Sequence, residues 1–230
     1  MSTVTVNKGA QYERPDLAFK ALGGHYAFQD FELATNDSWT NTGSATVDSA
    51  YGSALYLDAA DEIEYAGLSE LYKPTAGYGF GGKSRTQIVW GAADDTTQDI
   101  GFVSSSIVGP AEMIGFSIAT SGATATPAAV ITCKFDDAST DSSVILGTAD
   151  LPVGFSVDGW HEYAVDVSVD ANAMVTAKYY IDGFMVKSIK VSGVGGWATA
   201  GLVWAQTNLT GSSTHDQAVD WISIGSDYRP

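Results

Sequence analysis

Two glutamates separated by one residue are the clearest candidates for chemistry in this sequence. Glu62 and Glu64 belong to an alternating run, Glu-Ile-Glu-Tyr, which is typical of a strand with both carboxylates on one face. Two carboxyl groups about 5 Å apart are the machinery of retaining glycoside hydrolysis. The same run also fits a solvated edge strand with Ile63 and Tyr65 turned inward, and this structural interpretation is the one we predict.

Nucleophilic catalysis needs a base beside the nucleophile, and three histidines are available to supply it. His161 stands inside a strand pattern and is predicted to be a packed structural ring. His215 precedes Asp216 in a loop-like run without a nucleophile motif, and His25 follows two glycines. The lone Cys133 lies in an apolar strand pattern, which predicts an inert buried thiol. We therefore predict that the protein is not an enzyme.

Aspartates crowd several loop-like segments, and such carboxylates are the hard oxygen ligands that calcium prefers. They are Asp94, Asp95, Asp99, Asp136, Asp137, Asp141 and Asp216. None of them has the spacing of an EF-hand loop. Solvated acidic turns are one interpretation, and a single calcium ion is the alternative. The candidate ligands for calcium are Asp94, Asp95, Asp136 and Asp137. No other cofactor is expected.

Tryptophans offer flat surfaces on which a sugar ring or a partner protein can pack. Four of them lie in strand patterns and are predicted to belong to the core: Trp90, Trp160, Trp204 and Trp221. Trp39 and Trp197 lie in loop-like surroundings and are the candidate contact residues for carbohydrate. The glycine-rich segment Gly79–Ser84 lacks the spacing of a phosphate-binding loop, so we predict a flexible connection there.

The elements that must position these residues are strands. Tyr163, Val165, Val167 and Val169 alternate with polar residues, as do Val175, Ala177, Tyr179 and Ile181. Asp182 and Gly183 supply the two positive-φ positions of a type I′ hairpin turn. Strands are predicted near 28–33, 45–48, 53–58, 62–66, 86–91, 100–107, 113–119, 128–135, 143–147, 161–169, 174–181, 184–190, 201–206 and 218–224. So many short strands indicate an all-β sandwich or barrel.

Composition restricts the partners. The 230 residues fit one all-β domain, and 27 acidic against 11 basic side chains give a formal charge of −16. This charge repels phosphate backbones and anionic membranes, so neither nucleic acid nor a membrane is expected as a partner. A single cysteine excludes an intrachain disulfide. No signal peptide or apolar span is evident, which predicts synthesis in the cytoplasm.

The chain divides into residues 1–24, an N-terminal arm or a first strand, and a main domain over 25–230. Pro15 breaks any regular element in the first part, and Gly23-Gly24 offers a hinge before the second.

Three separated pieces resemble the laminin-G-like and concanavalin A-like jelly-roll family. They are Gly52–Tyr65, the run Asp158–Val165 with the hairpin Tyr179–Gly183, and Ala218–Ile224. The resemblance implies a two-sheet antiparallel jelly-roll sandwich, in a family that contains lectins, glycan hydrolases, adhesion modules and virus coat-associated modules. Hydrolases of this fold carry a motif similar to E-x-D-x-x-E, and Gly67 stands where the third carboxylate of that motif belongs.

The first functional hypothesis is a non-enzymatic virion module, such as a phage capsid decoration (cement) protein or a fibre-associated domain. Its partners would be capsid or other virion proteins and further copies of itself, and the docking arm would use Tyr12, Arg14 and Phe19. The alternative is a carbohydrate-binding module for a cell-surface glycan, using Trp39 or Trp197 and calcium where present. A glycan hydrolase using Glu62 and Glu64 is a third hypothesis.

Overall fold

The computed structural model is built from antiparallel strands, and no described helix is long and apolar enough to cross a membrane. It describes residues 25–30, 39–42, 46–48, 54–57, 62–65, 72, 74–89, 96–104, 112–121, 128–137, 141–193, 202–208 and 216–226, with the backbone alone before residue 72. The strands are β1 (His25–Asp30), β2 (Trp39–Thr42), β3 (Thr46–Asp48), β4 (Ala54–Leu57), β5 (Glu62–Tyr65), β6 (Gly79–Val89), β7 (Thr96–Ser104), β8 (Glu112–Ser121), β9 (Ala128–Asp137), β10 (Val144–Ile145), β11 (Trp160–Val169), β12 (Met174–Ile181), β13 (Phe184–Ser192), β14 (Leu202–Asn208) and β15 (Asp216–Ser226). A short 3-10 helix, η3 (Thr148–Asp150), follows β10.

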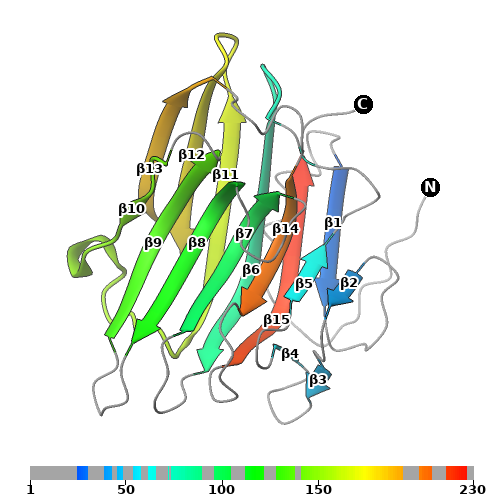
Figure 1. Cartoon of the computed structure of the whole chain (residues 1–230), viewed down its shortest axis with the longest axis vertical. Helices are drawn as coiled ribbons and strands as arrows, with labels where there is room; N and C mark the ends of the chain where they lie inside the picture. The colour runs from blue at the N-terminus through cyan, green and yellow to red at the C-terminus, as the bar shows by residue number, and fades with distance from the viewer. Residues whose placement is uncertain are drawn as a thin grey trace.

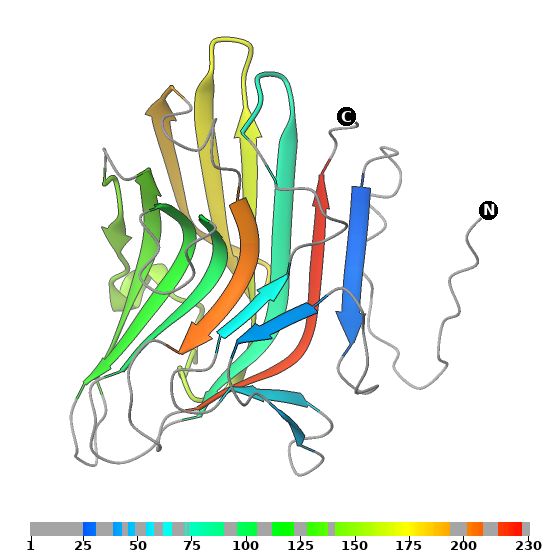
Figure 2. The same cartoon turned by 45° about the vertical axis from the view of Figure 1, so that its right-hand side comes forward.

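The strands form two layers (Figures 1 and 2). Sheet A is eight-stranded, in the order β13-β12-β11-β6-β15-β4-β3, with β1 also paired to β15. Sheet B is seven-stranded, in the order β10-β9-β8-β7-β14-β5-β2. Every strand pairing is antiparallel. Successive side chains of each strand point alternately toward the other sheet and away from it.

The core lies between the two sheets. The predicted inward sets of β11 and β12 are buried, which confirms their faces: Tyr163, Val165, Val167, Val169, Val175, Ala177, Tyr179 and Ile181. Aromatic rings join the layers, because Phe80 of sheet A packs edge-on against Phe102 of sheet B with 4.8 Å between centroids. Phe116 of sheet B likewise contacts Tyr179 of sheet A at 5.6 Å. Burial of these rings stabilises the sandwich.

The predicted hairpin turn is confirmed. Asp182 and Gly183 have φ angles of 51° and 78°, the left-handed values that a type I′ turn needs. Cys133 is fully buried as predicted, and burial raises the pKa of its thiol to about 12.

The structure overturns three sequence-based predictions about glycines and tryptophans, and two about acidic residues are corrected below. Gly79–Ser84 is the first half of β6, between β11 and β15 in sheet A, and not a flexible connection. Its glycines fit there because a Cβ at Gly82 would lie 2.2 Å from the Trp204 ring. Trp39 begins a strand, β2, where a loop was predicted. Trp160 and Trp221 are only partly buried, on the outer face of sheet A, whereas Trp204 is in the core as predicted.

Candidate functional site

Most residues predicted from the sequence to make contacts lie outside the described part of the chain. These are Tyr12, Arg14, Phe19, Trp197, Asp94 and Asp95. Trp39 pairs with Tyr65 through the β2 and β5 backbones. The roles predicted for these residues therefore stay predictions.

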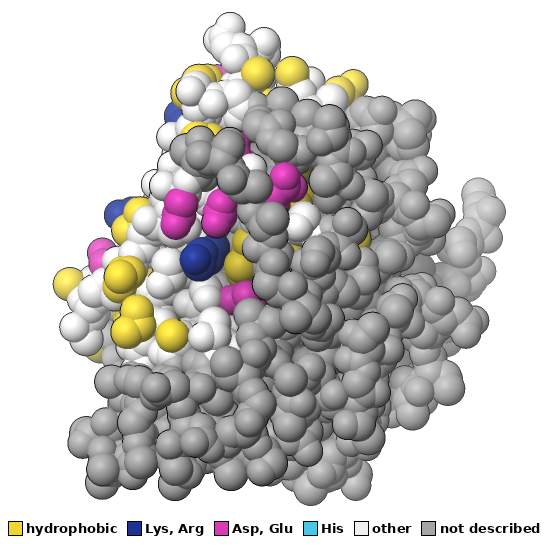
Figure 3. Space-filling model, in the orientation of Figure 1, with side chains coloured by type: hydrophobic (Ala, Val, Ile, Leu, Met, Phe, Trp, Pro, Cys, Tyr) yellow, Lys and Arg dark blue, Asp and Glu magenta, His cyan; other side chains and the backbone are white. Residues whose placement is uncertain are grey.

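Asp136 and Asp137, the remaining candidate calcium ligands, end β9. Residue Glu112 of β8 stands directly opposite Asp137, a neighbour that the sequence did not indicate. Burial, followed by the charges of Asp137 and Asp136, raises the pKa of Glu112. Figure 3 shows several acidic side chains on the described part of the outer face of sheet B. Among described residues no group of three or more His, Cys, Asp or Glu side chains could hold a metal, and calcium binding stays a prediction.

The glutamates Glu62 and Glu64 lie on β5, which is bounded by β14 and β2 and is therefore not the edge strand that we predicted. In the backbone register Glu62 stands opposite Thr207, and Thr207 stands opposite Asp99 on the next strand. Asp99 is 5% exposed, and burial raises its pKa, partly opposed by a hydrogen bond with Ser117. Sequence reasoning placed Asp99 in a loop, because its run lacks the apolar alternation of a strand.

A better-defined site lies on the outer face of sheet A, in a depression of about 220 Å³ that we call the outer hollow. Its lining comes from β6, β11, β12, β15 and the hairpin turn: Gly81, Gly82, Lys83, Glu162, Ala164, Asp166, Tyr180, Gly183, Ser223, Ile224 and Gly225. The outer hollow is thus built from strands that are far apart in the sequence.

Small residues in register explain why the face is hollowed there. Gly81 stands between Gly225 on β15 and Asp166 on β11. In the next row Lys83 stands between Ser223 and Ala164. Because opposite residues of an antiparallel pair project to the same face, the small members leave a floor without long side chains.

Charged side chains form the walls of the outer hollow. Lys83 Nζ lies 3.2 Å from Glu162 Oε1 and 5.3 Å from the centroid of the Trp221 ring. The Asp166 side chain makes no hydrogen bond or ion pair within 4 Å with a described residue, and Lys178 stands opposite it on β12. The surrounding side chains remove part of the hydration of this exposed carboxylate and so raise its pKa, and the charges of Lys178 and Lys83 partly oppose this rise. The Asp166 carboxylate therefore lines the outer hollow with acceptor positions that a ligand can use.

Tyr180 supplies an aromatic wall. It stands opposite Ala164 in the β11–β12 register, and its ring is partly exposed. Burial and then the Asp166 charge raise the pKa of the Tyr180 hydroxyl, which therefore stays protonated and can donate a hydrogen bond.

Hydrogen bonds of Asp182 and His161, outside the lining, fix the position of Glu162 and of the hairpin turn. Asp182 Oδ1 accepts a hydrogen bond of 2.9 Å from the backbone N–H of Glu162. His161 Nδ1 lies 2.7 Å from Asp182 Oδ2, and the His161 ring packs against Phe155 at a tilt of 33°, with 4.3 Å between the ring centroids. His161 is thus the packed structural ring predicted from the sequence, and it also anchors the turn that carries Gly183.

The outer hollow has the chemistry of a binding site. It combines an aromatic face, carboxylate acceptors and an ammonium donor in a small concave surface, the mixture that orients a polar ligand with apolar faces. The described lining contains neither histidine nor cysteine, and its ionisable side chains are Lys83, Glu162, Asp166 and Tyr180.

No known family model matches the sequence, and no curated protein matches it. Among solved structures, the chain is similar to endo-1,3-β-glucanase from Streptomyces sioyaensis, with a TM-score of 0.58 and 10% identity over 87% of this chain and 96% of that one. It is also similar to the potassium-bound Emp46p carbohydrate recognition domain, with a TM-score of 0.56 and 9% identity over 85% and 94% of the two chains.

A third similar structure is the CBM2 module of the evolved Dit of Lactobacillus casei BL23 phage J-1. Its TM-score is 0.52 and its identity 11%, over 90% of this chain and 99% of that one. Likeness at such low identity reports on the fold alone, and function is argued from the site. The predicted two-sheet, concanavalin A-like jelly roll is confirmed.

Proposed function

We propose that this chain is a carbohydrate-binding module that holds one sugar unit in the outer hollow. The observation that carries the proposal is the convergence of the Tyr180 ring, the unpaired Asp166 carboxylate and the Lys83–Glu162 ion pair on a floor of small residues. A sugar ring has hydroxyl groups around its rim and apolar C–H groups on its faces. The carboxylates and the ammonium group can hydrogen-bond to the hydroxyl groups, and the aromatic ring can pack on a C–H face.

The fold supports this proposal, since two of the similar structures are a carbohydrate recognition domain and a CBM2 module. The third is an enzyme, the endo-1,3-β-glucanase. We favour binding without hydrolysis, because the outer hollow offers one unpaired carboxylate, whereas glycoside hydrolysis uses two that flank the scissile bond.

The test is a broad glycan array followed by calorimetric titration of the best-binding sugar. Asp166→Asn removes the charge of the unpaired acceptor, Tyr180→Ala removes the ring, and Tyr180→Phe keeps the ring without its hydroxyl. We expect at least a tenfold loss of affinity for Asp166→Asn and Tyr180→Ala, which corresponds to about 1.4 kcal/mol, and a smaller loss for Tyr180→Phe.

Asp136→Asn is the matched control, because it makes the same chemical change on the other sheet. Circular dichroism melting must show that each variant is folded. No binding across the array, or binding that Asp166→Asn and Tyr180→Ala leave unchanged, would disprove the sugar site in the outer hollow.

The virion role is a second candidate function. The similarity to a module of a phage protein favours it, together with a net charge of −16, which suits a protein displayed at high local density. Light scattering of the purified chain, followed by co-sedimentation with phage particles that lack decoration, tests this role. A chain that stays monomeric and does not sediment with particles contradicts it. Localisation in the virion and contact through the 1–24 segment belong to the same proposal.

A further inference from the structure

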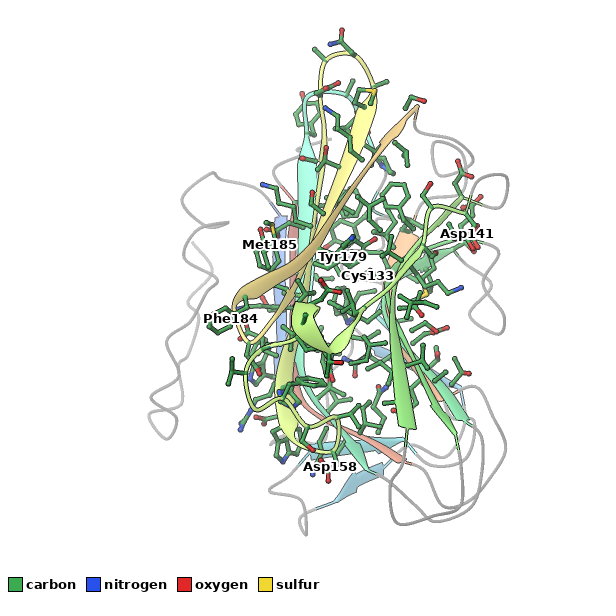
Figure 4. The ribbon with its side chains drawn as sticks, turned by 90° about the vertical axis from the view of Figure 1, so that its left-hand side faces the viewer. Cys133, Asp141, Asp158, Tyr179, Phe184 and Met185 are labelled. Atoms are coloured by element: carbon green, nitrogen blue, oxygen red, sulfur yellow. The ribbon has the colours of Figure 1, made fainter. Side chains whose placement is uncertain are left out.

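An exposed apolar shelf adjoins the outer hollow at the edge of sheet A. Phe184 and Met185, the first residues of β13, are 66% and 57% exposed. Met185 stands opposite Tyr180 and faces away from sheet B, whereas Phe184 stands opposite the buried Ile181 at the start of the edge strand. Figure 4 shows both at the margin of sheet A, whereas Tyr179 and Cys133 lie between the sheets. Together these two exposed apolar side chains offer a small apolar surface at the edge of the sheet, on which a ligand can pack.

The hairpin register places Met185 beside the outer hollow. The two-residue turn sets the pairs Ile181–Phe184 and Tyr180–Met185, and the register then shifts so that Lys187 stands opposite Tyr179. Because paired residues share a face of the sheet, Met185 lies on the outer face with Tyr180. The row Ala164, Tyr180, Met185 therefore runs continuously across three strands, over two strand spacings of roughly 4.8 Å each.

The outer hollow is open on the side of this shelf. Gly183 lines the hollow at the hairpin turn, and a Cβ placed on it would meet nothing within 4 Å. A volume of about 220 Å³ lies below the roughly 300–1,000 Å³ of pockets that enclose drug-sized ligands. A ligand longer than one sugar unit must therefore continue outside the hollow, and among the described residues the side at Gly183, next to Tyr180, is open.

The charges of the described residues around the outer hollow indicate the charge of the sugar chain that it can bind. Asp166 and Glu162 face the outer hollow, Lys83 is paired with Glu162, and Lys178 stands opposite Asp166, so the described charges nearly balance and none is left over for an anionic or a cationic sugar. The shelf itself carries no charge. This combination favours a neutral ligand with apolar ring faces.

We propose that the physiological ligand is a neutral linear glycan that crosses the strands of sheet A, with one unit in the outer hollow and the adjoining unit on Met185 and Phe184. This inference rests on the proposed function and specifies its substrate class. It assigns to β13 a second subsite that no sequence motif marks.

The experiment compares chain lengths. Neutral linear gluco-, manno- and galacto-oligosaccharides of increasing length, from the monosaccharide upward, are titrated by calorimetry into the wild type and the double variant Phe184→Ala/Met185→Ala. Uronic acid oligomers of matching length serve as the anionic comparison. Ile145→Ala is the matched control, because Ile145 is also 66% exposed on an edge strand, but on sheet B.

For one neutral series we expect affinity to rise by about tenfold from the monosaccharide to longer chains. The double variant should lose that gain, keep its affinity for the monosaccharide and unfold like the wild type. Affinity independent of chain length, tighter binding of uronic acid oligomers, no binding of any neutral series, or an unaffected double variant would each overturn the inference.

These outcomes are distinct from failure of the proposed function. Binding of a branched or charged glycan that Asp166→Asn abolishes would leave the sugar site standing while refuting the linear neutral class. A dimer that Phe184→Ala/Met185→Ala dissociates in light scattering would assign the shelf to a second copy of the chain, and would also overturn the inference.

Discussion

His161 on β11 and Asp182 in the β12–β13 turn form a close pair, with 2.7 Å between Nδ1 and Oδ2. The second ring nitrogen of His161 lies 2.7 Å from the carbonyl oxygen of Ser156. Both partners are hydrogen-bond acceptors, so a ring N–H of His161 can donate to the group that it faces. Asp182 thereby links the loop before β11, the strand itself and the turn that borders the outer hollow.

The first prediction concerns this pair. Asp182→Ala loses the contacts with His161 and the Glu162 N–H, and it places alanine at a φ of 51°. We expect the free energy of unfolding to fall by about 1–3 kcal/mol. Asp182→Asn should cost less, because asparagine tolerates positive φ and can still accept from Glu162. Urea unfolding of both variants measures this, and equal losses would contradict the turn argument.

Gly82 tests the reassignment of Gly79–Ser84 to a central strand. A Cβ at this position would lie 2.2 Å from the Trp204 ring, so Gly82→Ala should lower the free energy of unfolding by about 1–3 kcal/mol. At Gly147 an added Cβ meets its nearest atom only at 3.4 Å, which makes Gly147→Ala the control. A neutral Gly82→Ala would mean that this segment is not packed against Trp204. Thermal melts followed by tryptophan fluorescence also report on the ring.

The Cys133 thiol should be unreactive in the folded protein. Its side chain is fully buried, and burial raises its pKa to about 12, so very little thiolate exists near neutral pH. Mass spectrometry after incubation with iodoacetamide should show modification in denaturant and none without it. Rapid labelling of the native protein would mean that β9 opens readily, because solvent must reach the core before the thiol can react.

The buried carboxyl of Asp99 should make stability dependent on pH. Its pKa in the folded protein is raised above 3.8, so the folded state binds the proton more tightly than the unfolded state does. Its contribution to stability is therefore most favourable below 3.8 and is lost as the pH rises through the folded pKa. Asp99→Asn stays neutral and should show a smaller fall in urea stability between acidic and neutral pH.

Asp141→Asn is the contrasting variant for this measurement. Hydrogen bonds from Ser143 lower the pKa of Asp141, so its contribution is present above 3.8 and is lost as the pH falls through the folded pKa. The two substitutions should change the pH dependence in opposite directions. The same change in both would contradict the assignment of Asp99 as a buried acid.

Gln217 is fully buried between the sheets, and neither its amide nitrogen nor its amide oxygen has a hydrogen-bond partner in the part of the chain that the structure describes. Gln217→Met keeps the length of the side chain and removes the unsatisfied amide, which should raise the free energy of unfolding by about 1–3 kcal/mol. Gln206→Met should help less, because Gln206 donates a 3.1 Å hydrogen bond to Thr86. A destabilised Gln217→Met would indicate an internal water that satisfies the amide.

Features that depend on neighbouring residues could be predicted from the order of amino acids. Alternation along 161–169 and 174–181 predicted which side chains of β11 and β12 face the core, and Asp182-Gly183 predicted the hairpin between β12 and β13. These features follow from the two-residue period of a strand and from the φ angles that a tight turn requires. The burial of Cys133 and Trp204 followed from the same patterns.

The neighbours of each strand could not be predicted from the sequence and are known from the folded arrangement. Gly81 reads as part of a loop in sequence, but it lies opposite Asp166 and Gly225, both of which are distant along the chain. The outer hollow exists because these small residues meet in one row, and no local pattern encodes that register. Trp160 and Trp221 have the alternation of core residues yet lie on the outer face, because the strand period marks two faces without saying which is buried.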